Sequence, residues 1–297
     1  MKRSRTKNAI VHGGIVKHKA MNSPLIYLSK FVETSYPIVY KALCKALNAS
    51  GIEHRLLPHS MDIWTRDFMP IHIGGSQYVT FRYEPDYLSG KSRKFITDQR
   101  AAIDGLDLSI ADPLDVKLDG GNYVRCGDKV LMTDKLLMEN ASFTPRKLLA
   151  RLEKAFQAEL ILLPWDMEEP YGHADGMVSY LGEGRLLLNN YRQFGRKAIP
   201  FANRLRRILE AQFEVVEAYY EGKPNSHSWC YLNYLETPKT ILLPGLSKDS
   251  HCDSDQAALS FFQQIFPSKQ IVQVYAAPLI KKGGAIHCIT WEHFPSS

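Results

Sequence analysis

The residues that could do chemistry gather in five short polar clusters. Three clusters contain aspartate, two contain histidine and two contain cysteine, and they lie at residues 62–67, 118–122, 172–176, 228–233 and 283–290. Glycines beside several of these residues would allow the backbone to approach a substrate closely. Because the clusters are far apart in the sequence, they can form one site only if the fold brings them together.

The combination of a cysteine, a histidine and several acids restricts the chemistry. Cysteine attacks as the thiolate, which a nearby base or positive charge stabilises. Several carboxylates would raise the pKa of such a thiol, unless the substrate itself brings positive charge. A guanidinium fits, because its planar fork pairs with carboxylates and its charge would stabilise the thiolate that attacks its central carbon.

A repeated layout along the chain would position these clusters. Four segments combine an amphipathic helix with a following apolar strand, with helices expected over 37–49, 145–158, 200–212 and 253–266. Their spacing predicts a further helix over residues 91–105, followed by a strand. The chain then consists of five units of about 54 residues each.

A period of this length, with several strands and one helix per unit, predicts a closed α/β array. The polar clusters recur near the first strand of each unit, so closure would bring them to a common axis. The alternative is an open α/β sheet in which the equal spacing is a coincidence.

Four of the motifs, in this order, resemble those of agmatine deiminases and bacterial-type peptidylarginine deiminases. They are Trp64-Thr-Arg66-Asp67, Asp119-Gly120-Gly121-Asn122, Gly172-His173-Ala-Asp175 and Gly283-Gly284-Ala-Ile-His287-Cys288-Ile-Thr290. The resemblance covers most of the chain, from Ile52 to Thr290. Because these enzymes belong to the guanidine-modifying, or pentein, superfamily, it implies a five-bladed pseudo-symmetric α/β propeller.

By this resemblance, Cys288 is the nucleophile and His173 is the general acid and base. Cys288 would attack the guanidinium carbon while His173 helps ammonia to depart. Water activated by His173 would then hydrolyse the thiouronium adduct to a ureido product, with no metal or organic cofactor. An amidinotransferase of the same superfamily, in which an amine replaces water, is the related alternative.

The other matching residues would hold the substrate. The resemblance implies that Asp67 and Asp175 grip the guanidinium nitrogens and that Asp119 is the acid beside the histidine. It also implies that Trp64 forms a wall of the substrate channel and that Asn233 is a polar substrate-binding residue. The implied substrate is agmatine, which would place the enzyme in putrescine biosynthesis, or another arginine-like molecule.

The sequence departs from the family pattern at three positions. Lys282 and Ala285 stand at the first and last positions of a Gly-Gly-Gly-Asn motif, and Met69 replaces a glycine after Asp67. The segment before the first motif is also shorter than in typical agmatine deiminases. Because the catalytic set is intact, deiminase chemistry is expected, and the identity of the substrate is the open part.

The net charge of +6 is concentrated near the N-terminus. Seven basic residues precede the first acid, Glu33, and the rest of the chain is close to neutral. We therefore expect a basic, poorly ordered leader over residues 1–22 and a single catalytic domain over residues 23–297. The charge of this domain does not indicate nucleic-acid binding, although a non-catalytic pentein-fold binding protein is an alternative of a different class.

The five cysteines are widely and irregularly spaced, which fits neither a disulfide framework nor a zinc site. His173 and Asp175 could bind a metal with His251 or Asp253, but no second close pair of ligands supports this. The leader lacks the apolar core of a signal peptide, and no run has the ~18 apolar residues of a membrane helix. We expect a cytoplasmic enzyme that binds a small guanidino substrate and neither membrane nor nucleic acid. The sequence does not distinguish a monomer from a homodimer.

Two residues next to the proposed catalytic groups have competing interpretations. His287 adjoins Cys288, but neighbours on a strand point to opposite faces, which favours His173 as the base and a structural role for His287. Arg66 is expected to pair with an acid and to hold the loop that carries Asp67.

Overall fold

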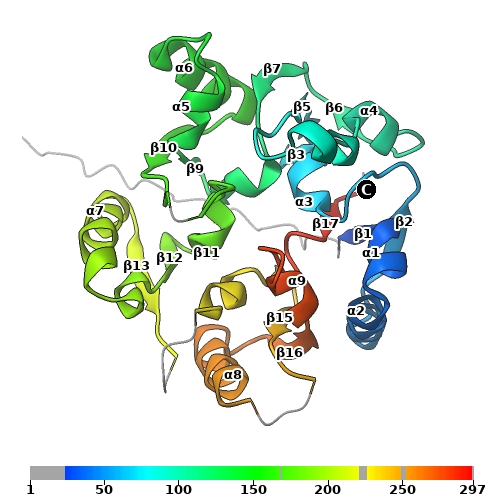
Figure 1. Ribbon diagram of the computed structural model, residues 1–297, viewed down its shortest axis with the longest axis vertical. Helices are drawn as coiled ribbons and strands as arrows, with labels where there is room; N and C mark the ends of the chain where they lie inside the picture. Colours follow the sequence, from blue (N-terminus) through cyan, green and yellow to red (C-terminus); the bar gives the residue numbers. More distant parts are fainter. Residues whose placement is uncertain (1–23, 168, 221–225, 249–251, 296–297) are drawn as a thin grey trace, which may run out of the picture.

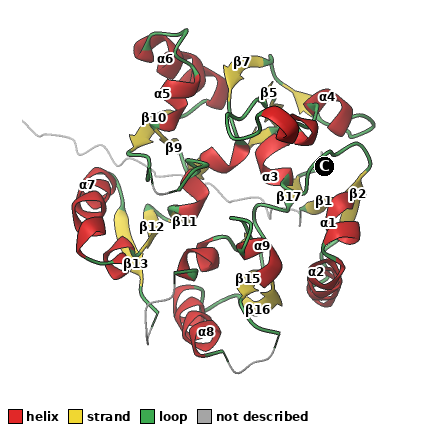
Figure 2. Cartoon of the chain, viewed as in Figure 1, coloured by secondary structure: helices red, strands yellow, loops and turns green. Residues whose placement is uncertain are grey.

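The computed structural model describes residues 24–295 except 168, 221–225 and 249–251, so the leader over residues 1–22 lies outside the described part. The described strands form five three-stranded sheets and one two-stranded sheet. These sheets lie around a common centre, with the longer helices on the outside (Figures 1 and 2). The expected α/β class is therefore confirmed.

Three consecutive units share one layout, in which two antiparallel strands precede a helix and a third strand parallel to the second. The helix supplies the crossover that a parallel pair requires. The units are β8 (Val124–Cys126), β9 (Lys129–Thr133), α6 (Pro145–Phe156) and β10 (Glu159–Leu163); β11 (Val178–Gly182), β12 (Arg185–Asn189), α7 (Ile199–Glu210) and β13 (Glu214–Ala218); and β14 (Leu235–Glu236), β15 (Thr240–Gly245), α8 (Asp253–Ile265) and β16 (Gln270–Tyr275).

Another unit is assembled from the two ends of the described chain. Its central strand is β1 (Leu25–Ser29), which pairs in parallel with β2 (His54–Leu57). On its other side β1 pairs antiparallel with β17 (Trp291–His293), the last strand. Between β1 and β2 the chain forms α1 (Lys30–Ser35) and α2 (Pro37–Ala49), the second with the bounds expected from the sequence.

The remaining unit departs from the expected pattern. Its strands form two sheets, β3 (Ile71–Gly74) with β4 (Gln77–Val79) and β6 (Ser109–Ile110), and β5 (Phe81–Arg82) with β7 (Leu114–Lys117). The prediction of one helix over 91–105 was wrong. The chain there forms a 3₁₀ helix, η1 (Gly90–Phe95), and one turn of α-helix, α4 (Gln99–Ala102). Because η1 buries no side chain, no apolar face stabilises a longer helix.

The outer helices form where apolar residues recur at helical spacing. In α6, Pro145 occupies the first turn, where its missing N–H is tolerated, and Leu148, Leu152 and Phe156 are buried on one face. These faces pack on the neighbouring strands, and the buried side chains form three apolar clusters between the sheets. The core is thus divided among the units, which leaves polar segments free to meet at the centre.

Short helices and turns carry the polar clusters. Four of the clusters overlap α3 (Thr65–Phe68), η2 (Gly120–Asn122), η3 (Ala174–Gly176) and η6 (Ser228–Leu232). The other short helices are α5 (Lys135–Glu139), η4 (Tyr191–Phe194), η5 (Arg196–Ala198) and α9 (Ala277–Ile280). The segment that carries Cys288 is a series of turns between α9 and β17 and not a strand. Side chains in these turns do not alternate between two faces as they do on a strand, so only their contacts define where they point.

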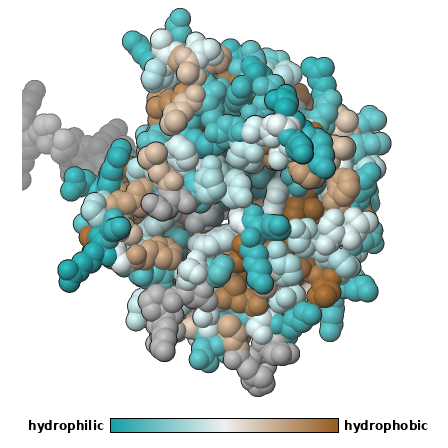
Figure 3. Space-filling view, in the orientation of Figure 1, coloured by the Kyte–Doolittle hydropathy of each residue, from teal (hydrophilic) through white to brown (hydrophobic). Residues whose placement is uncertain are grey.

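Polar side chains cover most of the face seen in Figure 3, and apolar residues gather in small separate groups. In the part of the chain that the structure describes, no helix is both long and apolar enough to cross a membrane.

Candidate active site

His173 lies between two carboxylates that come from other units. Its Nε2 is 3.1 Å from Asp119 Oδ2, and its Nδ1 is 3.7 Å from Asp67 Oδ1. His173 immediately precedes η3, Asp119 immediately precedes η2, and Asp67 lies on α3. The structure therefore brings together three residues that the sequence places 52 and 54 positions apart.

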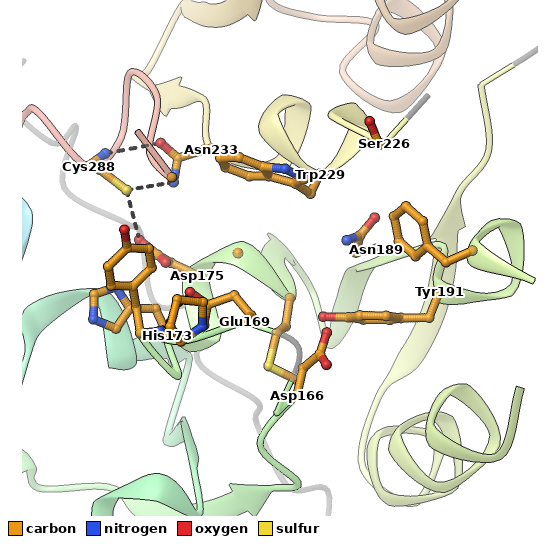
Figure 4. Close-up of a pocket in the computed structure, with 16 residues that line it drawn as sticks. Asp166, Glu169, His173, Asp175, Asn189, Tyr191, Ser226, Trp229, Asn233 and Cys288 are labelled. Atoms are coloured by element: carbon orange, nitrogen blue, oxygen red, sulfur yellow. Dashed lines mark hydrogen bonds between the residues drawn. The ribbon is translucent and has the colours of Figure 1, made fainter. Parts of the chain in front are cut away.

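Cys288 lies on the other side of this cluster and is 6% exposed. Asn233 Nδ2 donates to its Sγ at 3.0 Å, and the thiol lies 3.9 Å from Asp175 Oδ2 (Figure 4). Asn233 Oδ1 also accepts hydrogen bonds from the backbone N–H groups of Cys288 and Ala285. Asn233 thus fixes the turn that presents the thiol, which is more than the substrate-binding role expected for it.

Two glycines allow this close approach. A Cβ at Gly120 would lie 2.0 Å from the carbonyl oxygen of Arg66, and a Cβ at Gly121 would lie 2.6 Å from His173 Nδ1 and 2.8 Å from Asp67 Oδ1. Only glycine leaves room for the histidine and the carboxylate to meet beside this backbone.

Replacing Gly121 with alanine is expected to lower kcat at least about 100-fold, because an added methyl group would displace His173 and Asp67 by an ångström or so. The measurement is the steady-state release of ammonia, the product that the sequence resemblance implies. Gly245→Ala is the matched control, since its Cβ would lie 3.6 Å from the nearest atom, an ordinary contact. Equal activity of the two variants would contradict the close packing at Gly121.

Burial and charge set the protonation of the cluster. Burial raises the pKa of Asp67 to about 8 and that of Asp175 to about 6, while the nearby imidazole opposes both shifts. Burial disfavours the charge on His173, but Asp67, Asp119 and Asp175 outweigh it and raise its pKa to about 10. Burial and the charges of Asp175 and Asp67 raise the pKa of Cys288 well above its usual value.

Without substrate, the cluster therefore holds an imidazolium and a neutral thiol, and the carboxyl groups of Asp67 and Asp175 ionise only at a higher pH than usual. A second cation between Asp67 and Asp175 would reverse these preferences, because it would stabilise the carboxylates and the thiolate together. The arrangement suits a substrate that brings its own positive charge.

Arg66 forms an ion pair with Glu292 of β17, so the prediction that it pairs with an acid is confirmed. Its backbone N–H also donates to the carbonyl oxygen of Cys288 at 3.0 Å. Arg66 therefore ties α3, which carries Asp67, to the turn that carries the thiol.

His287 and Cys288 lie in a turn and not on a strand, so the expectation that they alternate like strand neighbours was wrong. The Nε2 of His287 lies 3.8 Å from Asp175 Oδ2, so this side chain also faces the acids. Burial and the charge of Arg66 lower its pKa well below the usual value, which keeps the ring neutral. Its backbone N–H donates to the carbonyl of Asn233, which supports a structural role.

Two cavities meet at the thiol. A smaller one of about 350 Å³ and a larger one of about 880 Å³ share Tyr171, His173, Gly283 and Cys288. Trp64 lines only the larger cavity, beside Gly284, where a Cβ would lie 2.4 Å from the indole.

Tyr171 lines both cavities. Its hydroxyl donates to the carbonyl of Lys282 at 3.3 Å, and its ring lies over Gly283. Tyr171 was not predicted, because a lone tyrosine in a loop gives no pattern. Glu169 was not predicted either; its carboxylate accepts from the backbone N–H groups of Tyr171 and Gly172.

Lys135 was missed as well, because a lysine that opens a short helix normally points to solvent. Its side chain is 2% exposed and pairs with Asp86 and Glu139. A Cβ at Gly172 would lie 2.3 Å from its Cδ, so Lys135 supports the loop that leads to His173.

The departures from the family pattern leave this arrangement intact. Met69 has an ordinary extended backbone (φ −79°, ψ 152°) and packs in the core, so this position does not need glycine. Ala285 contributes its backbone N–H to Asn233, and Lys282 its carbonyl to Tyr171.

No group of three or more His, Cys, Asp or Glu side chains in the described ranges is arranged to hold a metal ion. His251, proposed as one metal ligand, lies outside the described residues.

Comparison with known proteins identifies the family of this chain and some of its relatives. Residues 33–294 match the model of a family described as Porphyromonas-type peptidyl-arginine deiminase. An agmatine deiminase of Pseudomonas fluorescens is 26% identical over 212 residues, which cover 59% of this chain and 56% of that protein. This chain spans about half the length of the curated relatives it matches.

Solved structures share the fold. The agmatine deiminase of Enterococcus faecalis matches with a TM-score of 0.67 at 19% identity, over 93% of this chain and 94% of that one. A cysteine-to-serine variant of C. jejuni agmatine deiminase with substrate bound matches with a TM-score of 0.69 at 16% identity, over the same fractions.

Proposed function

This chain belongs to the Porphyromonas-type peptidyl-arginine deiminase family, and from that premise we propose that it is a cysteine-dependent deiminase. It hydrolyses the guanidino group of agmatine or another arginine-like molecule to a ureido product and ammonia. The observation that carries this proposal is the convergence of Cys288, His173 and three aspartates on one buried point. The agmatine deiminases among its relatives support the substrate class.

In the proposed reaction the guanidinium lies between Asp67 and Asp175, next to the thiol. Its charge offsets the carboxylates that raise the pKa of Cys288, so the thiol releases its proton to solvent and the thiolate forms a C–S bond with the central carbon. Protonated His173 transfers its proton to the departing nitrogen, and ammonia leaves a thiouronium adduct. The neutral imidazole then takes a proton from water, whose oxygen adds to the same carbon. The C–S bond breaks with its electron pair going to sulfur, and the hydroxyl proton passes to the sulfur, which leaves the ureido product and the free thiol.

The other residues orient these groups. Asp119 holds the imidazole through Nε2, Asn233 donates to the sulfur, and Trp64 forms a wall of the larger cavity. The substitution to serine in the C. jejuni enzyme with bound substrate supports the role of Cys288.

The proposal includes the finer architecture and the setting of the protein. The repeated sheets and outer helices support a five-bladed propeller over residues 23–297, in which β17 closes the array by pairing with β1. We further propose that the protein acts in the cytoplasm on a small guanidino substrate, with no role for nucleic acid or membrane.

The test is an ammonia-release assay with agmatine, arginine, methylated arginines and arginine peptides, combined with colorimetric detection of the ureido product. One mole of each product per mole of substrate is expected for at least one compound. Turnover of none would overturn the proposed function and leave the fold unaffected. Release of an amine in place of ammonia would indicate amidinotransfer.

The affinity for agmatine is expected to rise with pH between about 6 and 8. Asp67 and Asp175 must ionise to pair with the guanidinium, and burial raises the pKa of Asp67 to about 8 and that of Asp175 to about 6. Affinity therefore falls as pH drops through each value, by up to about tenfold per pH unit for each carboxyl group.

This dependence is best measured by calorimetry with the Cys288→Ala variant, in which the thiol does not titrate. At pH 7 binding should release protons to the buffer, and adding Asp67→Asn should reduce that release. Constant affinity from pH 6 to 8 would show that the carboxyl groups are already ionised before the substrate binds.

A further inference from the structure

The smaller cavity contains a buried polar group that the proposed chemistry does not use. Asn189, the last residue of β12, lines this cavity and is only 3% exposed. Its Oδ1 has no hydrogen-bond partner among the described residues. The same amide group forms a hydrogen bond with the Tyr191 side chain, so it is held in place at the cavity wall. Because buried amide oxygens normally accept a hydrogen bond, Oδ1 is available to a donor that enters the cavity.

The charge of the lining indicates the kind of donor. Asp166 and Glu169 line the same cavity, and no lysine or arginine is among the described residues that surround it. The effect of these charges is seen at Tyr191, where burial and the charges of Asp166 and Glu169 raise the pKa far above its usual value. A cation is therefore favoured in this cavity over an anion.

The walls are suited to an organic cation. The rings of Trp229 and Tyr191 lie on opposite sides of Asn189, and Phe194 completes the aromatic lining (Figure 4). An ammonium group attracts aromatic faces and has three N–H donors, one of which can reach a carbonyl oxygen while the others face carboxylates. An alkyl chain would lie against the same rings.

The larger cavity has a different character. Lys94 and Lys282 line it together with Asp62 and Asp67, so its lining contains both signs of charge. The thiol stands between this mixed cavity and the acidic, aromatic one. A substrate whose guanidinium lies at Cys288 can therefore place its other end in either of two chemically distinct spaces.

We propose that the smaller cavity is a second cation subsite, in which Asn189 binds the ammonium end of an aminoalkylguanidine while the guanidinium lies at Cys288. The inference rests on the proposed function and extends it, because it assigns the far end of the substrate to named residues. Asn189 is then a specificity-determining residue that distinguishes a substrate with an ammonium group from one with an uncharged end.

The test compares two ligands of nearly equal size, agmatine and n-butylguanidine, which lacks the ammonium group. Calorimetry with the full-length Cys288→Ala protein measures binding without turnover. Agmatine should bind at least about tenfold more tightly, as expected for a hydrogen bond to a charged donor. Asn189→Leu should remove most of this preference by weakening agmatine binding and leaving n-butylguanidine unchanged.

Two further variants make the comparison specific. Asn190→Leu changes the neighbouring asparagine, which does not line the cavity, and should retain the preference. Asn189→Asp keeps an acceptor oxygen at the same place and should also retain it, which gives a result even where Asn189→Leu fails to fold.

Three results would overturn the inference. They are equal binding of the two ligands by the parent protein, equal weakening of both by Asn189→Leu, and loss of the preference in Asn189→Asp. In each of these cases the guanidines still bind and the proposed function survives. Failure of both guanidines to bind, together with no ammonia release by the unmodified protein, would overturn the proposed function itself.

Discussion

Replacing Cys288 with alanine is expected to lower the rate of deimination at least about 10⁴-fold, because no covalent path remains. The sulfur is buried and forms its contacts with Asn233 and Asp175, two groups that remain in place without it. The variant should therefore fold normally and still bind the guanidino substrate. Ammonia release and calorimetric binding measure the two properties separately.

The matched control is Cys44→Ala, which removes a partly buried thiol from α2, away from the cluster. It should retain full activity. Substantial turnover by Cys288→Ala would show that water attacks the guanidinium directly, and the covalent mechanism would then be wrong. Mass spectrometry of the unmodified protein quenched during turnover should detect the adduct on Cys288.

The second large effect is expected at His173. Replacing it with glutamine keeps hydrogen-bonding capacity toward Asp119 and Asp67 but removes the transferable proton, so kcat should fall about 10²- to 10⁴-fold. The substitution also removes a cation from between carboxylates, so the affinity for the cationic substrate should not fall. A loss confined to kcat therefore identifies proton transfer, whereas a loss confined to KM would indicate a binding role.

His72→Gln is the control for this variant. His72 lies on β3, stacks on Phe294 and contacts the carbonyl of Gly75, away from the acids. Its replacement should leave kcat unchanged. Ammonia release by His173→Gln within a few-fold of the unmodified protein would exclude the imidazole as the acid of the first step.

The sequence predicted the layout of the fold where apolar residues repeat. The helix over residues 37–49 has the expected bounds, because its apolar periodicity is matched by burial. The helix expected over 91–105 failed because its first part, η1, buries no side chain and so has no packed face to extend it. Local propensity without packing does not sustain a helix.

The meeting of the acids with His173 and Cys288 was also predictable, since their clusters occupy equivalent places in the repeat. Two contacts could not be predicted: the hydrogen bonds by which Asn233 fixes the turn of Cys288, and the hydrogen bond from Tyr171 to the carbonyl of Lys282. Both depend on contacts between units through turns, where side chains follow no period. The unpaired side-chain oxygen of Asn189 could not be predicted either, because this residue ends a strand whose other residues are mostly apolar and buried.

The pairing of β17 with β1 has a consequence for timing. Cys288 lies three residues before β17 and 113 residues after Asp175, so it leaves the ribosome roughly 6–23 s later at typical rates of synthesis. The acids and His173 can gather earlier, but Cys288, the proposed nucleophile, joins them only when β17 pairs with β1. Under the proposed function, activity should therefore begin in a single late step, and its onset would report the pairing of these two strands.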